Sequence, residues 1–178
     1  MDIDTRFKGR IITVNIEKVL LPNGRLAALE IVRHPGGATI VALDEHNNIC
    51  MLRQYRHAAG GWLWELPAGK LEPGELPLHT AQRELIEEAG VTARHWHDLG
   101  RMLPSPGVYA EVIHLFIARG LTPCVTAHED HEVIEVHWLP FDEVWQRTVD
   151  GEYSDAKTAI AILRTHALLA AGRLPELT

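Results

Sequence analysis

The segment from Gly69 to Val91 reads GKLEPGELPLHTAQRELIEEAGV, and it decides how the rest of the chain is interpreted. Pro77 suits the first turn of a helix because its missing N–H would have no partner there, and Gly90 is a typical residue just past a helix end. The segment therefore predicts a helix over Pro77 to Ala89. Its apolar face consists of Leu78, Ala81, Leu85 and Ala89.

Three glutamates lie on the other side of this predicted helix. Glu84 and Glu88 are four residues apart and Glu87 is three from Glu84, so their carboxylates project from adjacent sides of one turn. Each like-charged pair costs about 2 to 3 kcal/mol at a separation of about 6 Å and an effective dielectric of about 20. A divalent cation would remove that cost. Arg83 precedes Glu87 by four residues and can hold a ligand carboxylate in place.

The chemistry of these groups favours Mg²⁺. This ion accepts oxygen ligands, keeps several waters and is commonly shared between a few carboxylates and substrate phosphates. Cleavage of a diphosphate needs positive charge near the bridging and leaving oxygens, and two or three ions beside this helix would supply it. Gly69 and Gly74 allow a tight loop that brings backbone carbonyls towards the ions. For RELIEE alone, a solvated helix face is the alternative interpretation.

Composition restricts the class of protein. The chain has 178 residues and 46% apolar content, which suits one core, or one core with a small appendage. Its net charge is −7 with no basic run, which disfavours non-specific binding to nucleic acid. The N-terminus has no apolar signal-peptide core and no stretch approaches the length of a membrane span. We therefore expect a cytoplasmic protein without a membrane partner, with Cys50 and Cys124 reduced in the core.

The remaining segments alternate strands with two further helices. The Asn-Gly turn in LPNG (21–24) predicts a hairpin between strands at 10–20 and 25–33. Further strands are predicted at 38–44, 49–55, 94–102, 112–121 and 132–139, a short apolar segment at 62–67, and helices at 141–150 and 155–171. This order predicts an α/β/α sandwich with a mixed sheet. We expect a small N-terminal antiparallel β unit at 1–35 and a main domain at 36–178.

The spacing of glycines, glutamates and arginine in the opening segment matches the Nudix box: G, five residues, E, seven residues, then R-E-apolar-x-E-E-x-G-apolar. The chain thus resembles Nudix hydrolases, which use Mg²⁺ and act on nucleoside diphosphates linked to another moiety. Further stretches resemble the ADP-ribose pyrophosphatase branch: VRHPGGA (32–38), RQYR (53–56), WELPAGKLEPGE (64–75), PSPG (104–107), IHLFIARGL (113–121), EDHEVIEV (129–136) and DAKT (155–158). The resemblance implies the Nudix sandwich, and a homodimer whose N-terminal strands are exchanged between protomers.

The same resemblance implies roles for individual residues. Glu84 and Glu88 would be the main ligands of Mg²⁺ (or of Mn²⁺ as a substitute), with Glu87 assisting and the backbone carbonyl of Ala68 a further ligand. Substrate contacts are expected from Arg53, Arg56, Arg33 and Pro106. Among these, Arg56 is the preferred phosphate contact, and Pro106 matches the proline downstream of the box that accompanies ADP-ribose specificity. A surface arginine pair is the alternative interpretation of Arg53 and Arg56.

The family places the glutamate that activates water in an acidic loop. Here Glu129, Asp130 and Glu132 compete for this role, and Glu129 is preferred. The expected catalytic set also includes Glu87 and Arg83. A solvated acidic loop is the alternative for each loop carboxylate taken singly.

The expected reaction is Mg²⁺-assisted attack of water on a phosphorus of a nucleoside diphosphate sugar, with ADP-ribose giving AMP and ribose 5-phosphate. GDP-mannose or a broad range of nucleotide sugars is the alternative substrate. A non-catalytic nucleotide-sugar sensor is the alternative of another class, but such domains commonly lose box carboxylates, and this chain has them all. The acidic net charge disfavours RNA decapping.

Overall fold

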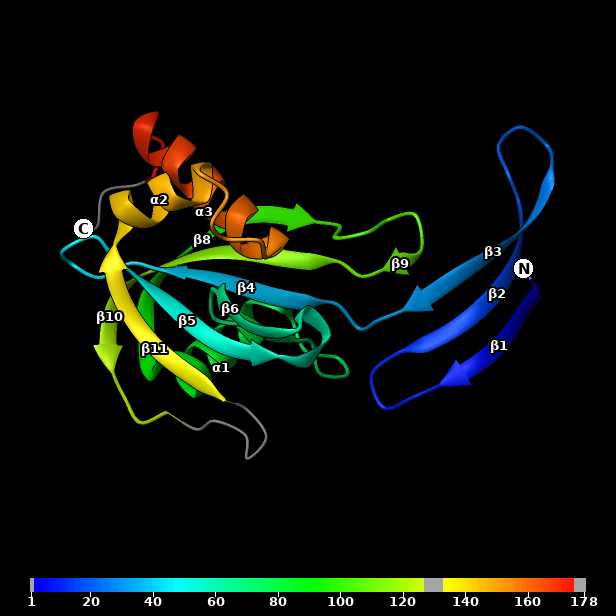
Figure 1. Cartoon of the computed structure of the whole chain (residues 1–178), viewed down its shortest axis with the longest axis horizontal. Coiled ribbons are helices and arrows are strands. Elements are labelled where there is room, and N and C mark those ends of the chain that lie inside the picture. Colours follow the sequence, from blue (N-terminus) through cyan, green and yellow to red (C-terminus); the bar gives the residue numbers. More distant parts are fainter. Residues whose placement is uncertain (1, 127–132, 175–178) are drawn as a thin grey trace.

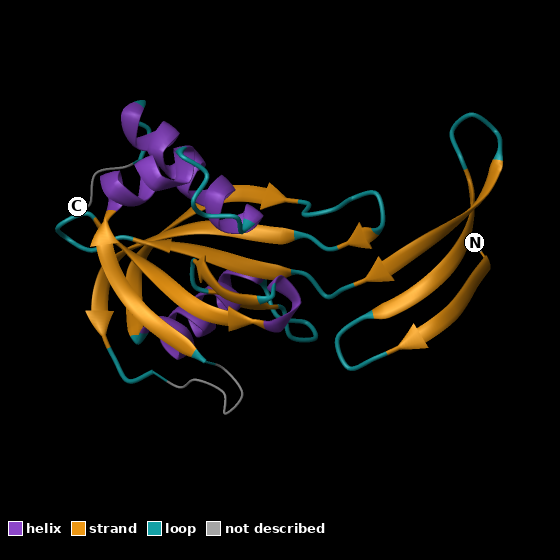
Figure 2. Cartoon of the chain, viewed as in Figure 1, coloured by secondary structure: helices purple, strands orange, loops and turns teal. Residues whose placement is uncertain are grey.

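The computed structural model describes residues 2–126 and 133–174 (Figure 1). Its main body has a central layer of strands, with helix α1 (Pro77–Ala89) on one face and helices α2 (Phe141–Val149) and α3 (Ala156–Ala170) on the other (Figure 2). A separate N-terminal sheet lies beside this body. The body is thus an α/β/α sandwich, which confirms the fold class predicted from the sequence.

Two sheets form the central layer, with strand orders β7-β4-β10-β8 and β11-β5-β6. A bridge between Leu43 and Ile49 connects them where β4 turns into β5. β10 runs parallel to β4, whereas the other neighbours in these two sheets are antiparallel, so the layer is mixed. The bounds are β4 Gly37–Ala42, β5 Asn48–Arg56, β6 Gly61–Glu65, β7 Ala68–Lys70, β8 Val91–Met102, β10 Ile113–Pro123 and β11 Ile134–Pro140, with a short 3₁₀ turn, η1 (His57–Ala59), between β5 and β6.

Strand β4 is apolar on both faces because it lies between the helices. Val41 packs with Val144 of α2 and Ile162 of α3, and all three are fully buried. Ile40 points the other way and packs with Leu85 of α1. The sequence of a strand that is buried on both faces is typically a continuous run of apolar residues. The two cores therefore hold α1 and α3 at fixed places on opposite sides of β4.

Helix α1 has the limits that the sequence predicts. It begins at Pro77, and Gly90 ends it with φ 65°. In this left-handed conformation the Gly90 N–H bonds to the Ile86 carbonyl at 3.1 Å, as is typical of a glycine-terminated helix. Ala81 and Leu85 are fully buried against the sheet, so the predicted apolar face is confirmed.

The N-terminal sheet has the order β1-β2-β3-β9, with β1 Asp2–Lys8, β2 Thr13–Leu20, β3 Leu26–Arg33 and β9 Tyr109–Ala110. The hairpin of β2 and β3 was expected, whereas β1 was not. β2 begins at Thr13 because the Gly9 N–H bonds to the Ile12 carbonyl at 2.9 Å in the turn that precedes it. β9 joins this sheet to the loop after β8. The division into domains at residue 35 stays a prediction.

Three further predictions concern the cysteines, the start of β8 and the absence of a membrane span. Cys50 is buried as expected, but Cys124 is exposed near the end of β10, so its assignment to the core was wrong; both thiols are free. β8 begins at Val91, earlier than predicted, because its pairing with β10 continues to that residue. In the described part of the chain, no helix has the length and apolar character needed to cross a membrane.

Candidate active site

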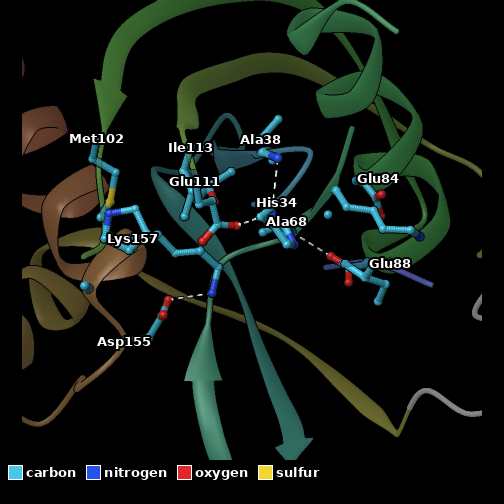
Figure 3. A pocket seen from close by; sticks show the side chains of 18 of the residues that line it. His34, Ala38, Ala68, Glu84, Glu88, Met102, Glu111, Ile113, Asp155 and Lys157 are labelled. Atoms are coloured by element: carbon cyan, nitrogen blue, oxygen red, sulfur yellow. Dashed lines mark hydrogen bonds and ion pairs between the residues drawn. The ribbon is translucent and has the colours of Figure 1, made fainter. Parts of the chain in front are cut away.

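A cavity of about 610 Å³ opens between α1 and the N-terminal end of α3. Small-molecule sites commonly have volumes of about 300 to 1,000 Å³. Figure 3 shows Glu84 and Glu88 on one side of the cavity and Lys157 and Asp155 on the other, with His34 between them. Strand β7 and the first residues of β4 form part of the wall. The cavity thus has a carboxylate side, from α1, and a side next to α3 that carries cations.

On the carboxylate side, Glu84 and Glu88 are buried and Glu87 is more exposed. Glu88 accepts a hydrogen bond from the backbone N–H of Ala68 at 2.7 Å between its Oε2 and the nitrogen. Gly69 lies so close to Glu84 that a Cβ atom at this position would overlap the carboxylate. β7 therefore packs directly against the glutamates, and a side chain at Gly69 would displace the Glu84 carboxylate.

Arg83 connects the glutamates of α1 with the loop that precedes the helix. Its Nη1 donates to Glu84 at 2.6 Å and to Glu87 at 2.9 Å, and its Nε and Nη2 donate to Glu75, each at 3.1 Å. Hydrogen bonds from Arg83 hold the pKa of Glu75 at about 2, well below its ordinary 4.5. These contacts are the ones expected of a guanidinium that orients carboxylates.

The donor set on this side fits a hard divalent cation. Glu84, Glu87, Glu88 and the Ala68 carbonyl offer oxygen atoms, which Mg²⁺ prefers, and the buried carboxylates call for positive charge. Within residues 2–126 and 133–174, no three acidic, histidine or cysteine side chains converge into a ligand group. Mg²⁺ usually takes one or two carboxylates and completes its shell with waters and substrate phosphates. The residues present therefore suit this ion better than a metal held wholly by protein.

On the side next to α3, two cations share one buried carboxylate. Arg56 donates to Glu65 from Nε at 2.8 Å and from Nη2 at 3.0 Å, and Lys157 Nζ donates to the same carboxylate at 2.6 Å. Lys157 also donates to Asp155 at 2.8 Å, and Asp155 caps α3 by accepting from the Thr158 N–H at 3.1 Å. Burial alone would raise the pKa of Glu65, but the two cations outweigh burial and lower it. Glu65 is therefore ionised at neutral pH.

Further polar groups line the cavity between these two sides. His34 Nδ1 lies 3.0 Å from Glu111 Oε1, and the pKa of Glu111 is raised, chiefly by burial. Thr39 is fully buried, and its hydroxyl has no hydrogen-bond partner among the described residues. A buried hydroxyl without a partner is costly in an apolar interior.

The structure separates Arg53 from Arg56. Arg56 lines the cavity, whereas Arg53 lies on the opposite face of β5 because alternate residues of a strand point to opposite sides. Arg53 bonds to Glu135 at 3.2 Å, and its guanidinium lies 4.9 Å from the ring centre of Trp62. In this chain, therefore, only Arg56 of the pair faces the site.

The other predicted site residues do not line the cavity or lie outside the described part of the chain. Arg33 belongs to the N-terminal sheet and forms a bidentate ion pair with Glu17. Pro104, rather than Pro106, lines the cavity in the loop after β8. The candidates for the catalytic base, Glu129, Asp130 and Glu132, lie outside the described residues.

Several residues of this site were not singled out from the sequence: His34, Glu111, Asp155 and Lys157 line the cavity, and Glu65 bonds to two of its lining residues, Arg56 and Lys157. Four of them lie in stretches that carry the family resemblance: His34 in VRHPGGA, Glu65 in WELPAGKLEPGE, and Asp155 and Lys157 in DAKT. These residues are far apart along the chain, so the sequence does not predict their contacts. Lys157 reaches Glu65 only because α3 packs on the sheet.

Comparisons with known proteins match most of the chain. A profile of the NUDIX domain matches residues 33–159. The methanol dehydrogenase activator of Bacillus methanolicus is 39% identical over 158 residues, covering 88% of this chain and 85% of that protein. The ADP-ribose pyrophosphatase of Bacillus subtilis (strain 168) is 38% identical over 158 residues, again covering 88% of this chain and 85% of that protein. A crystal structure described as an ADP compounds hydrolase has the same fold, with a TM-score of 0.82 at 19% identity over 98% of this chain and 95% of that one.

Proposed function

Because this chain belongs to the Nudix family and is a hydrolase, we propose that it cleaves the diphosphate of a nucleoside diphosphate sugar, with ADP-ribose as the preferred substrate. The observation that carries the proposal is the cavity itself: the box glutamates line one side, and Arg56 and Lys157 lie by Glu65 on the other. A diphosphate needs metal-binding carboxylates and free cationic donors together. The resemblance to the ADP-ribose pyrophosphatase of Bacillus subtilis supports the choice of substrate.

Nudix hydrolases generally need a divalent metal ion, and we propose Mg²⁺ here, with Mn²⁺ as a substitute. Glu84, Glu87 and Glu88 would hold the ion together with the Ala68 carbonyl. When bound, the ion polarises phosphoryl oxygens and lowers the pKa of a coordinated water. Arg83 keeps two of these carboxylates in place through its bonds to Glu84 and Glu87.

In the proposed reaction, water attacks one phosphorus and the bridging oxygen leaves with the electron pair of the broken P–O bond. One of the carboxylates of Glu129, Asp130 and Glu132 would take the proton of the water, with Glu129 preferred. Arg56 would contact a phosphoryl oxygen with the part of its guanidinium that Glu65 does not occupy. With ADP-ribose, the products are AMP and ribose 5-phosphate.

We also propose that the chain forms a homodimer through its N-terminal sheet and acts in the cytoplasm. Strand β1 is exposed along its whole length, and Ile3, Phe7 and Leu26 of this sheet are exposed apolar side chains. Apolar side chains gathered on a projecting sheet are typical of a protein–protein interface. Exchange of the N-terminal strands between protomers would cover them.

The test is hydrolysis of a panel that contains ADP-ribose, GDP-mannose, UDP-glucose, NADH, FAD and ATP, with Mg²⁺ and a phosphatase that releases phosphate from the products. A preference for ADP-ribose that disappears in Glu88→Gln is the expected result. Preference for GDP-mannose would retain the mechanism and replace the substrate. If no substrate gave activity that Glu88→Gln abolishes, a non-catalytic nucleotide-sugar sensor would become the better account.

A further inference from the structure

Charged side chains form an alternating row from α1 to the N-terminal end of α3. Glu88 lies on α1 and lines the same cavity as Arg56, which bonds to Glu65. Glu65 bonds in turn to Lys157, and Lys157 bonds to Asp155. Arg56, Glu88, Asp155 and Lys157 all line the cavity. The row therefore crosses the site from the glutamate side to α3.

Both cations of this row keep unused hydrogen-bond donors. Arg56 bonds to Glu65 through Nε and Nη2, which leaves the two N–H groups of Nη1 without a hydrogen bond to the described residues. Lys157 uses two of its three N–H groups, on Glu65 and Asp155. Cationic N–H donors that line a cavity can form charge-assisted hydrogen bonds to the oxygens of a bound anion.

We propose that Arg56 and Lys157 form a two-cation clamp for one phosphoryl group of the substrate, with Lys157 as a further substrate-binding residue and Glu65 as the residue that positions both. The inference rests on the proposed function, because it concerns the diphosphate in the same cavity. Glu65 accepts from both cations and is only 2% exposed, so it can fix the distance between them without touching the substrate.

A purely structural role for the Lys157–Glu65 contact fits the surroundings less well. The end of β6 is already joined to α3, because the Leu66 N–H donates to the Thr158 hydroxyl at 2.9 Å and that hydroxyl donates to Asp155 at 2.6 Å. The buried carboxylate of Glu17 offers a comparison, since it holds a single arginine, Arg33, and neither residue lines the cavity. Glu65 differs because it gathers a second cation that faces the site.

The test compares Lys157→Met, Lys157→Arg and Glu65→Gln with the parent enzyme. Lys157→Met keeps the aliphatic stem and removes the ammonium group, and Lys157→Arg keeps the charge. Glu135→Gln is the matched control. It breaks the Arg53–Glu135 pair, which lies on the face of β5 opposite to that of Arg56. The measurements are kcat and KM for ADP-ribose with Mg²⁺, inhibition by AMP and by ribose 5-phosphate, and the thermal midpoint of each variant.

The clamp predicts a rise in KM of about tenfold in Lys157→Met with kcat changed less than about twofold, because a charge-assisted hydrogen bond is lost equally from substrate and transition state. Lys157→Arg should recover most of the affinity. Glu65→Gln should raise KM similarly, and the double variant Glu65→Gln with Lys157→Met should be little worse than either alone. Inhibition should weaken for one product only, the one whose phosphate lies in the clamp, and Glu135→Gln should match the parent.

Unchanged KM and product inhibition in both Lys157→Met and Glu65→Gln, in an active parent enzyme, would overturn the clamp and leave the proposed function intact. A lower thermal midpoint in these variants with unchanged KM would assign the contact to stability and also overturn it. If the parent were inactive on the whole panel, the proposed function would fail, and direct binding of ADP-ribose would decide the clamp. A dissociation constant about tenfold higher in Lys157→Met would then support it, and an equal one would overturn it.

Discussion

Arg83 is the residue on which the order of the carboxylate side depends. It donates hydrogen bonds to Glu75, Glu84 and Glu87, so one guanidinium offsets part of the repulsion among neighbouring glutamates. Glu88 has a different partner in the backbone N–H of Ala68. The carboxylates are thus oriented by a helix residue and by a strand.

Gly69 provides a test of this close packing that leaves every carboxylate intact. A Cβ atom at Gly69 would overlap the Glu84 carboxylate, so we expect Gly69→Ala to displace Glu84 and to lower kcat about tenfold to a hundredfold, as loss of metal-site order does. Gly61→Ala is the control, because a Cβ there meets no atom within 4 Å. Steady-state hydrolysis of ADP-ribose would show the difference. Full activity in Gly69→Ala would mean that Glu84 is not needed in its observed position.

Glu75 gives a prediction for the dependence of stability on pH. Its folded-state pKa of about 2 is below the ordinary 4.5, so the ionised form stabilises the folded state above pH 4.5. This contribution decreases as the pH falls from 4.5 to about 2, where the folded protein also takes up the proton.

We therefore expect Glu75→Gln to be less stable than the parent at pH 7, with a difference that shrinks as the pH falls below 4.5. Urea unfolding of the metal-free proteins across this range measures it. A difference that stays constant with pH would show that the bond between Arg83 and Glu75 does not depend on the charge of Glu75.

At the scale of elements, the N-terminal end of α3 connects the helix layer to the site. The buried hydroxyl of Thr158 accepts from the Leu66 N–H and donates to Asp155, the residue that caps the helix. A backbone N–H that loses its partner in the interior costs about 1 to 3 kcal/mol. This hydroxyl therefore contributes to how α3 is held against the end of β6.

We expect Thr158→Val to lower the free energy of unfolding by about 1 to 3 kcal/mol, because the Leu66 N–H would be left without its acceptor. Thr165→Val on the same helix is the matched control. Thr165 is equally buried, but its hydroxyl only adds a bond to the Ala161 carbonyl within the helix, so a smaller loss is expected. Equal losses in the two variants, measured by urea unfolding, would contradict the assigned role of Thr158.

Elements whose limits depend on local residues were predictable, and those made by pairing were not. Pro77 and Gly90 determine the ends of α1 within the segment itself. β7 and β9 have three and two residues, and only their partners β4 and β3 make them strands. The same distinction holds for the site, because the glutamates share one helical turn, whereas Glu65 and Lys157 meet only when α3 packs on the sheet.

At the scale of the whole molecule, the N-terminal sheet is the part that the body does not cover. β1 is exposed throughout, and Phe7 is 55% exposed. The sheet is joined to the body through the start of β4 and through β9, which pairs with the end of β3 next to the cavity. A partner seated on this sheet would therefore lie close to the site.

The proposed homodimer predicts a mass in solution of twice the 19.9 kDa of one chain. Placing a charge at Phe7, as in Phe7→Asp, should weaken association because a carboxylate is costly to bury in an apolar interface. Val125→Asp is the control, since Val125 is exposed at the other end of the body, after β10. Light scattering coupled to size exclusion measures both variants. A parent protein that elutes as a monomer at micromolar concentration would contradict the dimer.

The central claim, hydrolysis of ADP-ribose by water at the box glutamates, is tested most directly by ³¹P NMR of the reaction with Mg²⁺. The account predicts that the diphosphate signals of ADP-ribose are replaced by the monophosphate signals of AMP and ribose 5-phosphate. It also predicts that Glu88→Gln, folded as the parent is, slows this conversion at least about a hundredfold. Intact ADP-ribose with the parent enzyme, or equal rates in parent and variant, would contradict it.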